Sequence, residues 1–474
     1  MKADTEVPPA SSLAQGLVSR AQAASPTPPP LRAYPTRLIV ETTSRCNLQC
    51  AMCVKQSSGA VPTDGDLDAG TFQALAPAFP HLESLVLNGV GEPLLHRSLE
   101  AFIRIARSAM PPHGSIGFQT NGILLDRRRA FGLLEAGLDR ASVSVDALDP
   151  KLLRELRAGD SLESVERAFA SLLHAKIEAN RPDFRIGMEF VAMRPNLAQL
   201  PALVEWAARR GISFILVSHL FPYDKTSLPL AAWDANLDLA VELLVKYREK
   251  GRAAGVDIGS YGRVYMKYAK SSEDERIVGL VGDMHAEAIE MGITLNIEKL
   301  LAADLGLFEE TKRAFAEARR IALREGVDIS LPEALPRRVR SCDFVESGAA
   351  FVSWDGKVHP CYFLWHRYAC YIGGIEKRVA PKVFGRLAGP GGAGPLEAGI
   401  AAGHAERDIL DIWNDPAFTT FRRNVTRYEY PYCFNCNLAL CDYVQLEDSE
   451  QDCHINAEPC AACMWCLGIF NCMT

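Results

Sequence analysis

The stretch that decides the fold is RLIVETTSRCNLQCAMC, residues 37–53. It opens with RLIVETT (37–43), an apolar run typical of a strand buried on both faces. A loop with the spacing Cys46-x3-Cys50-x2-Cys53 follows. Three thiolates on one short loop can ligate three irons of a cubane, which leaves the fourth iron without a protein ligand. A zinc site that borrows a distant cysteine, or three unrelated core cysteines, would give the same spacing.

Five further β-rich runs follow, separated by amphipathic helical patterns. They are SLVLNG (84–89), SIGFQT (115–120), RASVSVD (140–146), RIGMEFVAM (185–193) and SFILVSHL (213–220). Six β–α units in sequence predict an α/β fold with a parallel sheet, arranged either as an open, partial (β/α)6 barrel of the TIM type or as a doubly wound sheet. In both arrangements ligands bind at the carboxyl ends of the strands.

The helices between these strands are predicted from periodicity and from caps. The apolar positions of residues 99–110 fall on one helical face. Asp126 and Ser161 are placed to cap the starts of two further helices.

The length of 474 residues predicts two or more domains. Residues 1–33 are rich in proline and predict a flexible leader. Residues 34–222 carry the β–α units, and residues 223–341 show long helical patterns that predict a helical insertion or linker. Residues 342–474 combine short β-like pieces, glycine-rich loops and dense cysteines. This small C-terminal domain is predicted to depend on bound metal for its stability.

Composition and cysteine placement narrow the function. The net charge of −7 and the pI near 5.9 argue against a nucleic-acid partner. No apolar run approaches the ~20 residues of a membrane span, and the N-terminus lacks the apolar core of a signal peptide, which predicts a cytoplasmic protein. Of 14 cysteines, three lie in 46–53 and eleven from Cys342 onward. In a reducing compartment such clusters predict metal ligation rather than disulfides.

CNLQCAMC after a strand ending in Glu-Thr-Thr resembles the cluster loop of the radical S-adenosylmethionine (SAM) superfamily. The resemblance continues at the next three strand ends. It implies that Gly91-Glu92-Pro93 holds the methionyl amino group, that Thr120 and Asn121 belong to the family's turn after the third strand, and that Ser144 and Asp146 lie near the ribose and carboxylate of SAM. Each segment alone could be an ordinary turn. Their order at successive strand ends favours the family.

The resemblance implies an enzyme with a 4Fe–4S cluster that cleaves SAM to a 5′-deoxyadenosyl radical, which abstracts a substrate hydrogen. The implied partners are a peptide, protein or metal-cofactor precursor as substrate and a low-potential electron donor. Two alternatives stay open at this point. One is a non-catalytic iron–sulfur carrier or scaffold, and the other is a zinc-stabilised interaction protein.

The C-terminal cysteines resemble the SPASM extension of radical SAM enzymes, which carries up to two auxiliary 4Fe–4S clusters. Thirteen residues separate Cys342 from Gly356, and four residues separate Gly356 from Cys361, in a segment predicted to form a hairpin that turns at Asp355–Gly356. The later spacing departs from the usual pattern, and nine cysteines compete for eight ligand positions. The predicted ligands are Cys342, Cys361, Cys433, Cys436, Cys441, Cys453, Cys460, Cys463 and Cys472.

Cys370 and Cys466 are interpreted as bystanders, because free cysteine is often a small buried residue. A zinc knuckle is the alternative for the paired cysteines. The C-terminal string DCHINAEPCAACMWCLGIFNC is similar to SPASM proteins thought to mature metalloenzymes, including those linked to tungsten-cofactor oxidoreductases.

Overall fold

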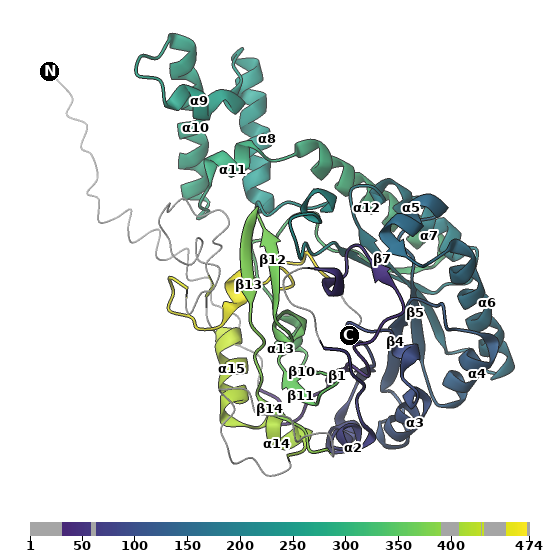
Figure 1. The fold of residues 1–474 in the computed structure, drawn as a ribbon. Coiled ribbons are helices and arrows are strands. Elements are labelled where there is room, and N and C mark those ends of the chain that lie inside the picture. Colours follow the sequence, from purple (N-terminus) through teal and green to yellow (C-terminus); the bar gives the residue numbers. More distant parts are fainter. Residues whose placement is uncertain (1–30, 58–62, 390–406, 428, 431–451, 472–474) are drawn as a thin grey trace.

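The computed structural model describes residues 31–57, 63–389, 407–427, 429–430 and 452–471. Nearly all of the predicted leader lies outside these residues. A single large sheet organises the rest of the chain, with helices outside it (Figure 1).

The six predicted strands lie side by side, in chain order, in this sheet. They are β1 (Arg37–Val40), β3 (Ser84–Val86), β4 (Ser115–Thr120), β5 (Arg140–Ser144), β7 (Arg185–Ala192) and β8 (Phe214–His219). Every pair of neighbours among them is parallel. The strand order does not return to its start, so the sheet stays open. The prediction of an α/β fold with a partial barrel is confirmed.

Two short strands extend the sheet beyond the prediction. β9 (Asp328–Ser330) pairs in parallel with β8, and β10 (Ala349–Val352) pairs in parallel with all four residues of β1. The predicted hairpin is present, since β11 (Lys357–His359) runs antiparallel to β10 and Gly356 turns the chain with a φ of +80°. β14 (Gly385–Arg386) pairs with β11 at that edge. The sequence predicts the hairpin but not the pairing of β10 with β1, and β9 lies in the segment predicted to be helical.

Helices cover the outer side of the strands (Figure 1). They are α3 (Leu99–Ala109), α4 (Arg127–Glu135), α5 (Pro150–Leu156), α6 (Leu162–Glu178) and α7 (Leu200–Ala208). Both predicted caps are confirmed. The Asp126 carboxylate accepts from the N–H of Arg129 at 2.7 Å, and Ser161 forms a capping box with Ser164.

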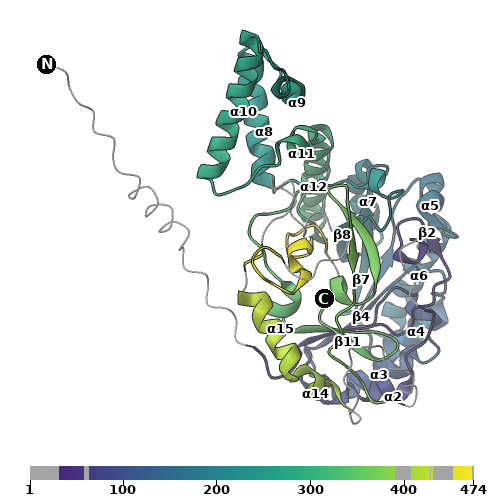
Figure 2. The same cartoon turned by 60° about the vertical axis from the view of Figure 1, so that its left-hand side comes forward.

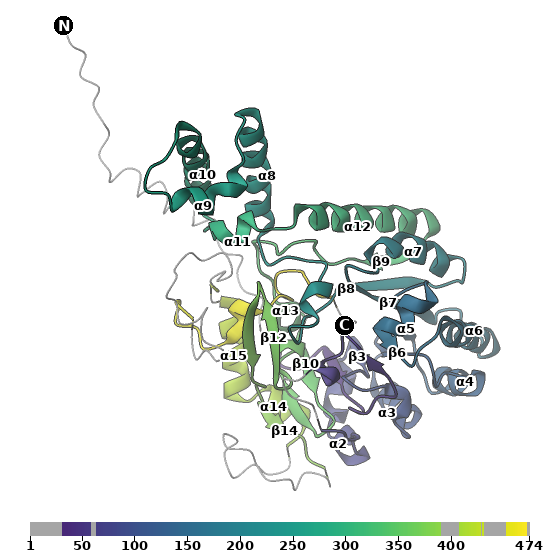
Figure 3. The ribbon, with the colours of Figure 1, turned by 45° about the horizontal axis from the view of Figure 1, so that its top comes forward.

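The helical segment after β8 has two parts. α8 (Asp238–Ala253), α9 (Tyr261–Tyr265), α10 (Ser272–Glu290) and α11 (Ile297–Leu301) project from the barrel, and Val241, Leu244 and Met284 belong to a separate small core (Figure 2). α12 (Leu305–Glu325) instead lies along α7 (Figure 3), and its Phe315 and Ile321 join the main core. Only the first part is an insertion in the structural sense.

The C-terminal part packs against the open side of the barrel (Figure 1). It contains α13 (Asp343–Glu346), the hairpin of β12 (Tyr368–Ile372) and β13 (Ile375–Val379), α14 (Ile409–Trp413) and α15 (Pro416–Arg427). Within the described residues, no helix is both long and apolar enough to cross a bilayer.

Candidate active site

The three cysteines of the first motif lie on one loop that follows β1. Within this loop β2 (Gln49–Cys50) pairs with β6 (Arg157–Ala158), which places Cys50 opposite Arg157. The N–H of Cys53 donates to the carbonyl of Cys50 at 3.0 Å. All three thiols are half-buried, and Cys46 and Cys53 both act electrostatically on Cys50. The structure therefore brings Cys46, Cys50 and Cys53 together.

The surroundings of this loop disfavour free thiolates. Burial raises the pKa of the Cys50 thiol to about 11, against a lowering by the Arg157 guanidinium. Burial also raises the pKa of Cys53. Three ionised thiols at this spacing would repel one another, so they stay protonated unless a cationic metal centre replaces their protons. The donor set suits iron, for which thiolates are the usual cluster ligands.

Glu92 braces the neighbouring turns. Its Oε1 accepts from the Thr120 hydroxyl at 2.6 Å and from the Leu94 N–H at 3.1 Å, and its Oε2 accepts from the Asn121 N–H at 2.8 Å. Burial raises the pKa of Glu92, against these hydrogen bonds. The Glu92 N–H donates to the Arg45 carbonyl at 2.7 Å. The carboxylate thus binds the protein's own turns and is not presented to a ligand.

Gly91 and Asn121 tie the same turns to the cysteine loop. A Cβ on Gly91 would lie 2.2 Å from the Thr43 carbonyl oxygen, so only glycine permits this approach. The Asn121 side-chain amide donates to Asn47 Oδ1 at 2.8 Å. Pro93 follows within a short 3₁₀ turn (Pro93–Leu95). The predicted residues 91–93, 120 and 121 therefore form one hydrogen-bonded unit with the cysteine loop.

Asp146 is fully buried and committed to an ion pair. Its Oδ2 accepts from Arg157 Nη1 at 3.0 Å, and its Oδ1 accepts from the Val191 N–H at 2.8 Å. Arg157 also pairs with Asp160 at 3.2 Å. Burial opposes the charge of Arg157, but these acids outweigh it and raise the pKa of Arg157. Asp146 is thus held by Arg157 and by the main chain of β7, and its place near the ribose and carboxylate of SAM stays a prediction.

Ser144 and Glu189 face each other across neighbouring strands. They are partners in the register of β5 and β7. On β7 the flanking Met188 and Phe190 pack into the helix-side core, so Glu189 points to the inside of the barrel. Burial and the charge of Asp146 raise the pKa of Glu189 to about 8, although Arg157 lowers it. Sequence reasoning missed Glu189. Its signal was a single acid inside the apolar run RIGMEFVAM.

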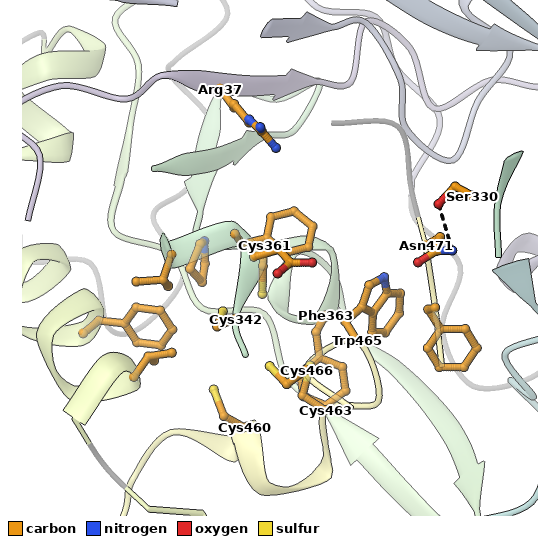
Figure 4. A pocket seen from close by; sticks show the side chains of 17 residues that line it. Arg37, Ser330, Cys342, Cys361, Phe363, Cys460, Cys463, Trp465, Cys466 and Asn471 are labelled. Carbon is orange, nitrogen blue, oxygen red and sulfur yellow. Dashed lines mark hydrogen bonds between the residues drawn. The ribbon is translucent and has the colours of Figure 1, made fainter. Parts of the chain in front are cut away.

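Five C-terminal cysteines line one cavity of about 220 Å³ (Figure 4). Cys342 precedes α13, Cys361 follows β11, and Cys460, Cys463 and Cys466 lie around a 3₁₀ turn at Pro459–Ala462. The volume is many times that of a single water site. Three separate segments of the chain thus supply thiols to one enclosed space.

Cys466 lies at the centre of this group. The thiols of Cys342 and Cys463 each donate a hydrogen bond to its sulfur. These two bonds hold the pKa of Cys466 well below its ordinary value despite burial, and Arg340 acts in the same direction. Cys466, interpreted from the sequence as a bystander, therefore lies among the cavity cysteines, and whether it binds metal stays open to test.

The remaining cysteines divide into two groups. Cys370 is buried within β12, opposite Lys377 of β13, away from this cavity, and Cys453 is exposed and does not line it. Cys433, Cys436, Cys441 and Cys472 lie outside the described residues. Their predicted ligation therefore stays a prediction.

A single metal ion does not explain either set of thiols. Among the described residues, no three His, Cys, Asp or Glu side chains are arranged to hold one ion. A cubane requires a different geometry, because each thiolate binds a different iron and the cysteine sulfurs therefore lie farther apart than around a single ion. Half-buried thiols on one loop and an enclosed cavity with five thiols both fit that demand, and the zinc alternative is disfavoured in this part of the chain.

Comparison with known proteins agrees with this geometry. The family model of the radical SAM superfamily matches residues 40–222, and that of the SPASM iron–sulfur cluster-binding domain matches residues 342–437. The chain belongs to the radical SAM superfamily and is a radical SAM enzyme with a SPASM domain. Its cofactors are SAM and 4Fe–4S clusters.

Among curated proteins, the chain is 27% identical over 443 residues to a "tungsten-containing aldehyde ferredoxin oxidoreductase cofactor-modifying protein" of Pyrococcus furiosus, covering 92% of this chain and 96% of the relative. It is 30% identical over 186 residues to a GTP 3′,8-cyclase of Chlorobaculum tepidum, covering 39% of this chain and 53% of that protein. Among solved structures, Streptococcus suis SuiB bound to SAM matches with a TM-score of 0.49 and 12% identity, covering 95% of this chain and 82% of that chain.

Proposed function

We propose that Cys46, Cys50 and Cys53 bind the 4Fe–4S cluster that receives SAM. The observation that carries this proposal is the joining of the three-thiol loop to the turns at 91–93 and 120–121 by hydrogen bonds. When bound, the cluster and SAM supply a 5′-deoxyadenosyl radical that abstracts hydrogen from the substrate. No fourth cysteine lies on this loop, which leaves one iron open for the cofactor.

The side chains around the loop have distinct roles in this proposal. Glu92 and Asn121 hold the turns in register, and Arg157 places a positive charge beside Cys50. Ser144 and the backbone of residues 91–93 line the SAM site. Glu189 holds a proton near neutral pH because its pKa lies near 8, so its carboxyl group can donate a hydrogen bond inside the barrel.

We further propose that an auxiliary cluster occupies the cavity in Figure 4. Its ligands are drawn from the five thiols that line the cavity, Cys342, Cys361, Cys460, Cys463 and Cys466. Because a cubane takes four protein thiolates, one of the five is in surplus. Cys433, Cys436, Cys441, Cys453 and Cys472 remain candidate ligands of a second auxiliary cluster.

For the substrate, we propose a metal-cofactor precursor or a peptide of a metalloenzyme, with a tungsten-cofactor oxidoreductase as the target to test first. The support is the similarity to the P. furiosus cofactor-modifying protein, which extends over 92% of this chain and 96% of the relative. Radical chemistry with reduced clusters requires a reducing compartment, so a cytoplasmic location is part of the proposal.

Anaerobic purification tests the proposal. A brown protein with about 8–12 irons per chain is expected, from two or three cubanes of four irons. Dithionite and SAM should then release 5′-deoxyadenosine. A colourless, zinc-containing protein would contradict the cluster assignment. An iron-replete protein that releases no 5′-deoxyadenosine would instead support the carrier alternative.

The substrate is tested separately by co-expression. A tungsten oxidoreductase produced with this enzyme should carry a cofactor or peptide whose mass differs from that produced without it. An enzyme with Cys50→Ala is the matched control for this comparison, because it retains the rest of the chain. Identical masses with the wild-type and variant enzymes would contradict the proposed tungsten oxidoreductase substrate but not the proposed radical chemistry.

A further inference from the structure

An arginine-lined groove runs between α3 and α4 on the outer side of the barrel. Its volume is about 530 Å³. Its charged lining residues are Arg97, Arg104, Arg128, Arg129, Glu100 and Asp126. Four positive and two negative side chains give the groove a net charge of +2, whereas the whole chain carries −7.

Most of this positive charge is available to a partner. Arg129 pairs with Glu100 at 2.8 Å. Arg97, Arg104 and Arg128 are exposed, and within the described residues they form no hydrogen bond or ion pair. Three unpaired guanidinium groups on one groove favour an anionic partner, because guanidinium groups form charge-assisted, often bidentate hydrogen bonds with carboxylates.

Hydrogen bonds connect the groove to the strand that leads into the proposed cluster loop. Arg129 Nη2 donates to the His96 carbonyl at 3.3 Å, and His96 Nε2 donates to the Leu67 carbonyl at 3.0 Å. Leu67 belongs to the segment that returns from the cysteine loop, where its N–H donates to the Thr42 carbonyl at 2.8 Å. His96 thus connects the groove to Leu67, whose main chain pairs with Thr42 at the end of the strand that leads into the cysteine loop.

A small apolar surface accompanies the charge. Leu124 is 39% exposed and lies two residues before Asp126, which caps α4 and lines the groove. Exposed arginines beside one exposed leucine are suited to a transient protein complex, in which electrostatic attraction speeds association and tight binding is not needed.

We propose that this groove docks an acidic, low-potential electron-carrier protein that reduces the cluster at Cys46, Cys50 and Cys53. This inference rests on the proposed function, since that cluster must take up one electron for each SAM cleaved. The carrier loses one electron, the cluster gains it, and no bond is made at the groove. Because the chain as a whole repels acidic partners, a local positive groove directs the carrier to this face.

The test replaces Arg97, Arg104 and Arg128 with glutamine in one variant. The control variant carries Arg263→Gln, Arg313→Gln and Arg319→Gln, three exposed positions on α9 and α12 that lower the net charge equally. An acidic low-potential ferredoxin and dithionite serve as alternative reductants. Cluster reduction is followed by absorbance in stopped flow, and 5′-deoxyadenosine is measured in parallel.

With ferredoxin at low salt, the groove variant should be reduced about tenfold more slowly than the control, and its rate should depend less on ionic strength. With dithionite, wild type and both variants should react alike. Equal ferredoxin rates in both variants would overturn the inference, as would an unchanged ferredoxin rate with slower turnover of a protein substrate. If dithionite fails in all three proteins, the proposed function fails and not the docking site.

Discussion

The two cysteine regions of this enzyme are built in opposite ways. The first collects three thiols within eight residues of one loop and fixes them through two neighbouring turns. The second collects five thiols from segments that lie more than a hundred residues apart in sequence, such as Cys342 and Cys460, around an enclosed cavity. The first has one thiol too few to saturate a cubane, and the second has one too many.

This difference indicates different tasks. A loop with three thiols leaves an iron open for a reactive ligand, as chemistry at a cluster requires. A cavity with a full set of thiols closes off its cluster, which suits stability or electron transfer. The four predictions below test this contrast, beginning with the largest expected effect.

Replacing Cys50 tests the open site. In Cys50→Ala, 5′-deoxyadenosine release should fall to background, because two thiols cannot hold the cluster. Iron analysis should show a loss of about four irons per chain while the auxiliary irons remain. Cys370→Ala, at a buried cysteine outside both regions, is the matched control and should keep full iron and activity. Full activity in Cys50→Ala would contradict the assignment of the three-thiol loop as the site that binds SAM.

Replacing Cys466 tests the closed site. Cys466→Ser should lose up to about four irons and lower the melting temperature, since the serine hydroxyl is a poor iron ligand. The electron paramagnetic resonance signal of the SAM cluster should persist. The comparison is again with Cys370, as Cys370→Ser. If Cys466→Ser keeps all its iron, Cys466 is the surplus thiol, and the other four are the ligands.

Glu92→Gln tests the brace between the turns. In wild type, both carboxylate oxygens of Glu92 accept hydrogen bonds, one from the Thr120 hydroxyl and one from the Asn121 N–H. Glutamine replaces one of these oxygens with an NH2 group, which is a donor. One buried donor then has no acceptor. Such a loss costs about 1–3 kcal/mol, and the Kd for SAM should rise by roughly 5- to 150-fold if the whole cost is felt in binding. Glu163→Gln, at an exposed helical position, should bind SAM normally. Loss of iron on the scale of Cys50→Ala would show that the turns hold the cluster rather than the cofactor.

The variant Glu189→Gln tests the raised pKa of Glu189 through the pH dependence of the unfolding free energy. Because the pKa of Glu189 rises from 4.5 to about 8, its contribution to stability is present below pH 4.5 and disappears as the pH rises through 8. Wild type should therefore lose about 5 kcal/mol of unfolding free energy at this site between pH 4.5 and 8.5, because a rise of about 3.5 pKa units corresponds to about 1.4 kcal/mol per unit. In urea unfolding, Glu189→Gln should lack this loss. Equal pH slopes would show that Glu189 is solvated.

The sequence predicts well what local patterns determine. Buried parallel strands are apolar throughout, so all six barrel strands stand out, and the first cysteine motif lies on a single loop. β9 and the pairing of β10 with β1 were not predicted, because both depend on contacts with strands that are distant in sequence. Cys466 and Glu189 escape for a related reason. The residues that surround each of them lie on segments distant in sequence, and a rule based on spacing along the chain does not describe such contacts.

The parallel pairing of β10 with β1 has a mechanical consequence. The strand that leads to Cys46 and the hairpin that leads to Cys361 share a continuous ladder of main-chain bonds, extended by the Glu41 N–H to the Val352 carbonyl at 2.8 Å. These two parts of the chain cannot swing apart without tearing the sheet. The distance between the start of the three-thiol loop and Cys361, one of the thiols of the cavity, is therefore fixed by main-chain hydrogen bonds.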